Sequence, residues 1–218
     1  LRLRRPRDTG AGIEENAVAR NAARALGKLA PAALYAIPDL LDTLEDPDDG
    51  LREAAARALG ELQAPEAVAA LCRRLSSGPE VAGGQRSDSP RLVEPCEALL
   101  EALGDIGVAT AEVLAVVEPF TTHSRPIIRS AAARTLLQLS GDPRWSGVLV
   151  ELLDHPQLQV RRAALMDLGA AGWRPALEPI GRTLAENSLK LMALRGLVEQ
   201  GKGDPGIPEL LACMDSLL

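Results

Sequence analysis

Arginine is the residue whose type and spacing in this chain most clearly suggest a chemical role. A segment of about twelve residues recurs six times, and one of its positions is arginine in four of the six copies. In chain order this position holds Arg24, Arg57, Glu101, Arg134, Met166 and Arg195. Equivalent positions of stacked repeats form a column, so we expect guanidinium groups along an inner, concave groove, with Arg162 close beside them. Such planar donors suit carboxylates.

The same arginines have a structural alternative. Glu53, Glu97 and Glu101 lie at neighbouring positions of adjacent copies, where each could accept an ion pair from an arginine of the next helix. The sequence leaves a ligand-binding column and an internal ion-pair network equally open.

A second basic set stands at the start of the recurring segment. It consists of Arg52, Arg129, Arg161 and, in the sixth copy, Lys190. Each follows an acidic or polar turn, so we predict that these side chains bond neighbouring turns and hold the repeats in register.

Residues typical of independent catalysis are scarce. His123 and His155 precede a recurring segment where other copies carry Asp or Glu, which predicts a turn or capping role. No metalloprotease, phosphate-loop, serine-hydrolase or CxxC motif is present, so a free-standing hydrolase or nucleotide enzyme is disfavoured. Cys96 opens a predicted helix, whose dipole would lower the pKa of its thiol, but we predict buried packing and not a nucleophile at this position.

The period of the recurring segment predicts the fold. LREAAARALGEL begins at Leu51, and close copies begin at Ile128 and Val160. The equivalent leucines are Leu26, Leu59, Leu103, Leu136, Leu168 and Leu197, separated by 33, 44, 33, 32 and 29 residues. Periods in this range are typical of stacked helical pairs. We therefore predict an all-α fold, an α-solenoid or α-α superhelix of about six helical hairpins, as one domain over residues 1–218.

The predicted partner helices lie between these copies, and several begin at proline, which is tolerated in the first helical turn. They cover residues 37–44, 65–75, 109–117, 146–153 and 175–184. The extra residues of the 44-residue gap lie in SSGPEVAGGQRSDSP, residues 76–90. Its Gly, Ser and Pro content predicts a mobile loop that does not pack.

Composition excludes several classes of protein. The chain has 24 basic and 30 acidic residues, a net charge of −6, which disfavours binding to nucleic acid. It contains no apolar stretch long enough to span a bilayer, and its three cysteines lack paired spacing. We expect reduced thiols in a cytoplasmic protein, with no metal site, no nucleic-acid partner and no membrane partner.

Several longer strings resemble a known family. RRAALMDLGAAGW at 161–173, AENSLKLMALRGLVE at 185–199 and MDSLL at 214–218 resemble the E subunit of the E/F-type phycobilin lyases of cyanobacteria, which are built from HEAT-like repeats. EPCEALLEALGDIG at 94–107 and AAARTLLQL at 131–139 fit the same pattern, so the resemblance covers roughly residues 14–218. Trp173 and Leu137 stand where the family pattern has tyrosine.

This resemblance implies a function. An E subunit and an F subunit form a heterodimer that attaches an open-chain tetrapyrrole, a bilin, to a cysteine of a phycobiliprotein through a thioether. The α subunit of phycocyanin is the expected acceptor, and no cofactor is expected because the bilin is the substrate. Two alternatives remain: a non-catalytic adaptor that binds phycobiliproteins during phycobilisome assembly or degradation, and a scaffold unrelated to pigments.

The resemblance also gives the arginine column a ligand, because a bilin carries two propionates. We predict that Arg134, Arg162 and Arg195 anchor these carboxylates. Trp173 is the predicted stacking surface, and Asn187 and Lys190 are predicted polar neighbours. Carboxylates that could favour the protonated bilin are Asp167, Glu186 and Glu97, each equally explained as a cap or a solvated helix position. The apolar segments PAALYAIPDLL and PELLACMDSLL are predicted docking sites for the F subunit or a second copy.

Overall fold

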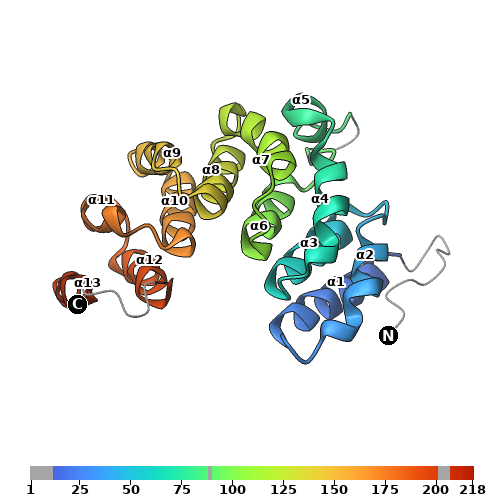
Figure 1. Cartoon of the computed structure of the whole chain (residues 1–218), viewed down its shortest axis with the longest axis horizontal. Helices are drawn as coiled ribbons and strands as arrows, with labels where there is room; N and C mark the ends of the chain where they lie inside the picture. The colour runs from blue at the N-terminus through green and yellow to red at the C-terminus, as the bar shows by residue number, and fades with distance from the viewer. Residues whose placement is uncertain (1–11, 88–89, 201–206) are drawn as a thin grey trace. The chain divides into compact units, whose positions relative to one another are not determined.

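The computed structural model describes residues 12–87, 90–200 and 207–218, and it confirms the all-α solenoid (Figure 1). Within these residues, six helices carry the recurring segment and six partner helices alternate with them. The six recurring-segment helices, called here the repeated helices, are α1 (Gly12–Lys28), α3 (Asp49–Glu61), α6 (Cys96–Ile106), α8 (Pro126–Ser140), α10 (Leu158–Ala171) and α12 (Asn187–Gln200). The partner helices are α2 (Ile37–Thr43), α4 (Val68–Leu75), α7 (Ala111–Val117), α9 (Arg144–Leu152), α11 (Leu177–Arg182) and α13 (Ile207–Asp215).

The chain divides into two compact units. Unit 1 comprises residues 1–119 and unit 2 comprises residues 120–218. In each unit the repeated helices lie side by side in one row, α1–α3–α6 or α8–α10–α12, and the partner helices cover one side of that row. We call the side of a row not covered by partner helices its inner face.

Most partner helices match the predicted ranges, with short 3-10 turns at several of their ends. These turns are η1 (Leu34–Ala36), η2 (Pro65–Ala67), η3 (Glu118–Thr122) and η4 (Arg174–Ala176). The largest difference is in α11, which ends at Arg182 because Thr183 adopts an extended ψ of 145°. Thr183, like Leu153 directly after α9, is 3% exposed, whereas Leu184 is 82% exposed.

Small residues let the repeated helices approach closely. A Cβ added at Gly196 of α12 would lie 2.7 Å from the carbonyl carbon of Gly169 on α10. A Cβ at Gly60 of α3 would lie 3.0 Å from the Cα of Ala102 on α6. Glycine lowers helix propensity, so its presence within these helices reflects backbone contact with the next repeat.

The second basic set holds the turns as predicted. Nη1 of Arg52, Arg129 and Arg161 donates in each case to the carbonyl oxygen six residues earlier, at 2.6 to 2.9 Å. Two of these side chains also reach the next repeat: Arg52 donates to the Val93 carbonyl and Arg161 to the Leu184 carbonyl, both at 2.8 Å. These bonds tie successive repeats together.

The histidines act as turn residues, also as predicted. Nδ1 of His123 accepts a hydrogen bond from the Arg125 amide at 2.9 Å, and Nδ1 of His155 accepts one from the Gln157 amide at 3.1 Å. A carboxylate oxygen of Asp46 accepts the corresponding bond from Asp48 in unit 1. The imidazole therefore replaces aspartate at the same turn.

The prediction that residues 76–90 do not pack is wrong. The segment contains helix α5 (Gly78–Ala82), and Ala82 is fully buried. Backbone hydrogen bonds then join Val93 to Gly84 and Arg86 to Arg91, both at 2.9 Å. Arg52 and Asp49 of α3 hold this small hairpin through Glu94 and Arg91. The segment packs because Val93, Glu94 and Arg91, which follow it in the chain, bond back to it and to α3. Amino-acid composition does not reveal such contacts.

Candidate functional site

On the inner face of unit 1, the arginine column closes into an ion-pair network. The Arg57 guanidinium lies 3.3 Å from the Glu53 carboxylate, 3.6 Å from Glu97 and in direct contact with Glu101. Arg57 and Glu101 occupy equivalent positions, so the column is real. In unit 1 the arginine of the column forms ion pairs with neighbouring carboxylates, as the internal ion-pair hypothesis predicts.

This network perturbs its own members. The pKa of the Glu97 carboxyl is raised, mainly by burial and next by the nearby Glu101 carboxylate. Burial opposes the charge of Arg57, but Glu101 and Glu97 raise its pKa overall. Three carboxylates around one guanidinium leave this part of unit 1 acidic, which does not favour an acidic ligand.

Arg134, the first arginine of the column in unit 2, lies in a buried cluster. Only 11% of the Arg134 side chain is exposed, and Nη1 lies 3.7 Å from the Asp167 carboxylate. Asp167 is 5% exposed and also accepts a hydrogen bond from the Ser130 hydroxyl. These contacts join α8 to α10, so the predicted anchor Arg134 and the predicted carboxylate Asp167 are directed mainly toward each other.

The other two predicted anchors of unit 2 are exposed. Arg162 on α10 forms no hydrogen bond or ion pair with any residue that the structure describes. The Arg195 side chain is 74% exposed and lies 2.7 Å from Glu199, one turn later on α12. Exposed pairs of this kind are weak, so both guanidinium groups are available to a ligand.

Two methionines lie on the same inner face. Met166 is one turn after Arg162 on α10 and is partly exposed. Met192 precedes Arg195 on α12 and is 59% exposed. Unit 2 therefore presents an inner face on which guanidinium groups alternate with flexible apolar side chains.

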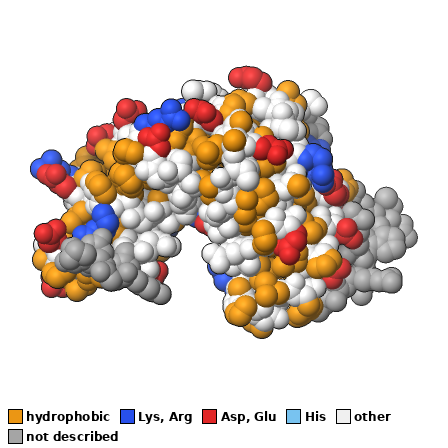
Figure 2. Space-filling model, viewed as in Figure 1, with side chains coloured by type: hydrophobic (Ala, Val, Ile, Leu, Met, Phe, Trp, Pro, Cys, Tyr) orange, Lys and Arg blue, Asp and Glu red, His pale blue; other side chains and the backbone are white. Residues whose placement is uncertain are grey.

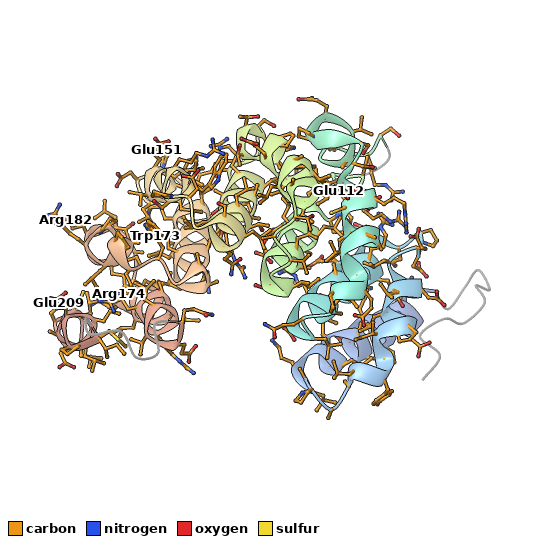
Figure 3. The ribbon with its side chains drawn as sticks, viewed as in Figure 1. Glu112, Glu151, Trp173, Arg174, Arg182 and Glu209 are labelled. Atoms are coloured by element: carbon orange, nitrogen blue, oxygen red, sulfur yellow. The ribbon has the colours of Figure 1, made fainter. Side chains whose placement is uncertain are left out.

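Charged side chains of the partner helices point away from the repeated helices. Glu151 of α9 and Arg182 of α11 project away from α10 and α12 (Figure 3). The space-filling view shows acidic and basic side chains next to one another on this face (Figure 2). Among the partner helices of unit 2 and their ends, Arg144 pairs with Asp142 and Arg182 pairs with Glu178.

Two family models match the chain. The "HEAT repeats" model matches residues 12–82 and 96–169, and the "PBS lyase HEAT-like repeat" model matches residues 160–186. Among curated proteins, the bilin biosynthesis protein RpcE of Synechococcus sp. (strain WH8020) is 49% identical over 205 residues, which are 94% of this chain and 75% of that protein. The phycocyanobilin lyase subunit alpha of Picosynechococcus sp. is 44% identical over 205 residues, covering 91% of this chain and 75% of that protein.

The chain belongs to the family of phycocyanobilin lyase alpha subunits. A solved structure agrees: the complex of CpcE and CpcF of phycocyanin lyase from Nostoc sp. PCC7120 contains a chain that matches with a TM-score of 0.88 and 40% identity. The match covers 100% of this chain and 80% of that one.

The remaining predicted site residues lie at opposite edges of unit 2. The Asn187 amide donates to the Leu217 carbonyl at 2.7 Å, and Lys190 Nζ donates to the Gly181 carbonyl at 2.9 Å. Glu186 is exposed, and its carbonyl accepts the Lys190 amide at the start of α12. These three residues lie where α12 begins.

Trp173 follows the opposite end of a repeated helix. It is partly exposed and comes directly after the C-terminal cap of α10, a helix of 14 residues (Figure 3). At 1.5 Å per residue that helix is about 21 Å long. Since successive repeated helices run in the same direction, Trp173 and Asn187 are about a helix length apart and do not form one cluster.

Two of the cysteines, Cys96 and Cys72, are poor nucleophiles. Cys96 is fully buried, and burial, with a smaller effect of Glu94, raises the pKa of its thiol to about 12. Loss of solvent outweighs the helix dipole that was expected to lower this pKa, and the favoured prediction of buried packing is confirmed. Burial also raises the pKa of Cys72. No group of potential metal ligands occurs among the described residues, and no described helix is long and apolar enough to cross a membrane.

Sequence analysis did not identify Met192 as a candidate site residue. The corresponding residue in the four preceding repeated helices is Ala54, Ala98, Ala131 and Ala163. The first three of these are at most 1% exposed. A single methionine in a row of alanines was therefore a signal present in the sequence.

Proposed function

We propose that this chain is one subunit of a bilin lyase that, together with an F-type subunit, attaches an open-chain tetrapyrrole to a cysteine of a phycobiliprotein. The observation that carries the proposal is the match over the whole chain to a subunit of the CpcE–CpcF phycocyanin lyase complex, at a TM-score of 0.88. The acceptor that we favour is the α subunit of phycocyanin, and the bilin is a substrate, so no cofactor is required.

The reaction needs few groups from this chain. The thiolate of the acceptor cysteine adds to the ethylidene group of ring A, a carbon–sulfur bond forms, the carbon–carbon double bond becomes single, and a proton from the medium ends on the neighbouring ring carbon. Nothing leaves, so no nucleophile of the lyase is consumed. Holding both reactants in a productive arrangement is the main contribution of the protein. The buried Cys96 and Cys72 are consistent with this role.

The exposed guanidinium groups supply the electrostatic attraction that holds the bilin. Arg162 and Arg195 lie on the inner face of unit 2, where they can bind the two propionates. Arg134 contributes less, because it is nearly buried beside Asp167. Glu186 and Asp167 stay candidates for favouring the protonated bilin, although Asp167 has little exposed surface. Glu97 belongs to the Arg57 network of unit 1 and is a weaker candidate.

The F-type subunit needs an apolar surface of this chain on which to dock. Leu34 and Tyr35, in the segment 31–41, are 47% and 70% exposed, and Leu211, in the C-terminal segment 208–218, is 49% exposed. These exposed side chains support both segments as docking sites. Tyr35→Glu tests the first segment: it should weaken co-purification with the F subunit, and unchanged co-purification would remove that segment from the interface.

Reconstitution tests the function. The chain is combined with an F-type subunit, phycocyanobilin and the apo-α subunit of phycocyanin, and covalent pigment on the acceptor is measured by fluorescence on a denaturing gel and by absorbance. A lyase increases the yield of one defined adduct over the reaction without either subunit. Binding to the acceptor with no increase in yield would instead identify an adaptor, and no change in bilin absorbance with no binding would identify a scaffold.

A further inference from the structure

The inserted segment of unit 1 is fastened to the repeat that it interrupts. Helix α5 lies at the end of α4 (Figure 1), and the chain that follows it turns back. The Val93 amide donates to the Gly84 carbonyl and the Glu94 amide donates to the Ala82 carbonyl, both at 2.9 Å. The chain after the insertion is thereby tied to α5.

Ion pairs fix the same segment to three helices. Glu94 lies 3.1 Å from Arg52 of α3 and 3.3 Å from Arg74 of α4. Arg74 also pairs with Glu45, which follows the C-terminal cap of α2. Arg52 and Glu94 are nearly buried, and loss of one partner of such a pair is costly, so the segment is held in one position.

This rigid segment carries apolar and cationic side chains outward. Val81 of α5 is 57% exposed and Val93 is 39% exposed. Arg91, two residues before Val93, and Arg73 of α4 have 57% and 66% of their side chains exposed. We call these four residues the hairpin surface. Its arginines pair with Asp49 and Glu45, and such exposed pairs are weak enough to exchange for carboxylates of a partner.

We infer that the hairpin surface docks the acceptor subunit of the phycobiliprotein while pigment is attached. The inference rests on the proposed function and names where its protein substrate binds. Four side chains cover much less than the roughly 800 Å² per partner that a stable complex buries, so the surface suits a protein that leaves after each reaction. The F subunit stays bound and needs a larger area.

Charge defines the part of the acceptor that fits. Exposed guanidinium groups beside two valines match an apolar patch that is flanked by aspartate or glutamate. Opposite charges of this kind accelerate encounter more than they lengthen residence, which suits repeated turnover. A second copy of this chain would bring arginine against arginine, so the hairpin surface does not favour self-association.

The test measures the initial rate of pigment attachment by the heterodimer at increasing concentrations of the apo-α subunit of phycocyanin. The double variant Arg73→Ala, Val81→Ser is expected to raise KM for the acceptor about fivefold and to keep kcat within about twofold. Added salt should raise KM of the natural chain more than that of the variant, because screening weakens an attraction that the variant has lost. Titration with phycocyanobilin, followed by absorbance, should not distinguish the two.

The double variant Arg182→Ala, Leu184→Ser is the matched control. It also removes an exposed arginine and an exposed apolar side chain, 78% and 82% exposed, but in unit 2. KM for the acceptor should stay at the natural value. An equal increase of KM in the control would overturn the inference.

The remaining outcomes separate the inference from the proposed function. If the natural heterodimer attaches no bilin to the acceptor, the proposed function fails. If it attaches bilin and the Arg73→Ala, Val81→Ser variant has the natural KM, the acceptor docks elsewhere and the function stands. A variant that no longer co-purifies with the F subunit would place the hairpin surface between the subunits, which also overturns the inference.

Discussion

The two units use the same repeat to make different inner faces. In unit 1, Arg57 meets Glu101 at the equivalent position of the next helix, and two further carboxylates complete the network. In unit 2, the next equivalent of Arg134 is Met166, which offers no charge, and Arg134 turns to the buried Asp167 instead. Both arginines are therefore satisfied within the protein, Arg57 by the equivalent residue of the next repeat and Arg134 by a buried carboxylate on the adjacent helix.

The largest expected effect comes from removing the buried carboxylate of unit 2. Asp167→Ala leaves Arg134 and Ser130 without a shared acceptor, and loss of one partner of a buried pair costs about 3 kcal/mol of unfolding free energy. Chemical denaturation of the purified chain measures it. Glu199→Ala, which breaks an exposed pair in the same unit, should change stability by less than about 0.5 kcal/mol. Equal effects of the two substitutions would show that Arg134 is not buried against Asp167.

The next effect concerns backbone contact between repeated helices. Gly196→Ala places a methyl group 2.7 Å from the Gly169 main chain, so we expect a loss of about 2 kcal/mol from overpacking. Gly147→Ala in α9 is the matched control, since no atom lies within 4 Å of its new Cβ. It should raise the melting temperature slightly, because alanine favours helix by about 0.5 to 1 kcal/mol. A stable Gly196→Ala variant would contradict the close approach.

A smaller effect distinguishes the two inner faces directly. Arg162→Ala should weaken bilin binding to the heterodimer about fivefold, roughly 1 kcal/mol, through loss of a charge-assisted contact to a propionate. Arg57→Ala should leave binding unchanged, because that guanidinium serves three carboxylates of unit 1. The comparison fails if Arg57→Ala has the greater effect on bilin absorbance.

The smallest expected effect depends on pH. Because the pKa of Glu97 is raised in the folded chain, the native state holds a proton that the unfolded state has lost just above the ordinary pKa of 4.5. This group therefore makes stability fall as pH rises from that value through the raised pKa. Almost half of the side chain is exposed, at 45%, so the effect is well under 1 kcal/mol.

Glu97→Gln removes that titration. Relative to the natural chain, the variant should gain stability as pH rises from 4 to 7, measured by thermal unfolding at each pH. A difference that does not change with pH would show that Glu97 ionises normally.

The fold could be predicted well because each repeat packs mainly against its neighbours in the sequence, so its apolar pattern can be read locally. The leucines at a period of about 33 residues fixed the helical pairs, and the placement of Arg161 six residues after His155 anticipated the bonds between turns. The packing of residues 76–90 escaped prediction, since Ala82 becomes buried only through contacts made across the inserted segment.

The candidate site was only partly predictable. The column placed Arg162 and Arg195 on one face, but the sequence could not show that Asp167 draws Arg134 inward, because that contact depends on how α8 and α10 are rotated. Trp173 and Asn187 lie near each other in the sequence, and yet a helix-length offset separates them in the repeat. Burial of Cys96 was predicted, but its raised pKa was not, because only the surrounding helices show how completely the thiol loses solvent.

The contact between Gly169 and Gly196 has a consequence for recognition. Main chain touches main chain there, so no side-chain rearrangement can change how far apart α10 and α12 stand. The separation of residues displayed by the two helices is therefore set by main-chain contact and not by side-chain rotamers. A long flexible chromophore that bridges them thus loses its own freedom on binding without also having to order its host, which favours attachment in a single conformation.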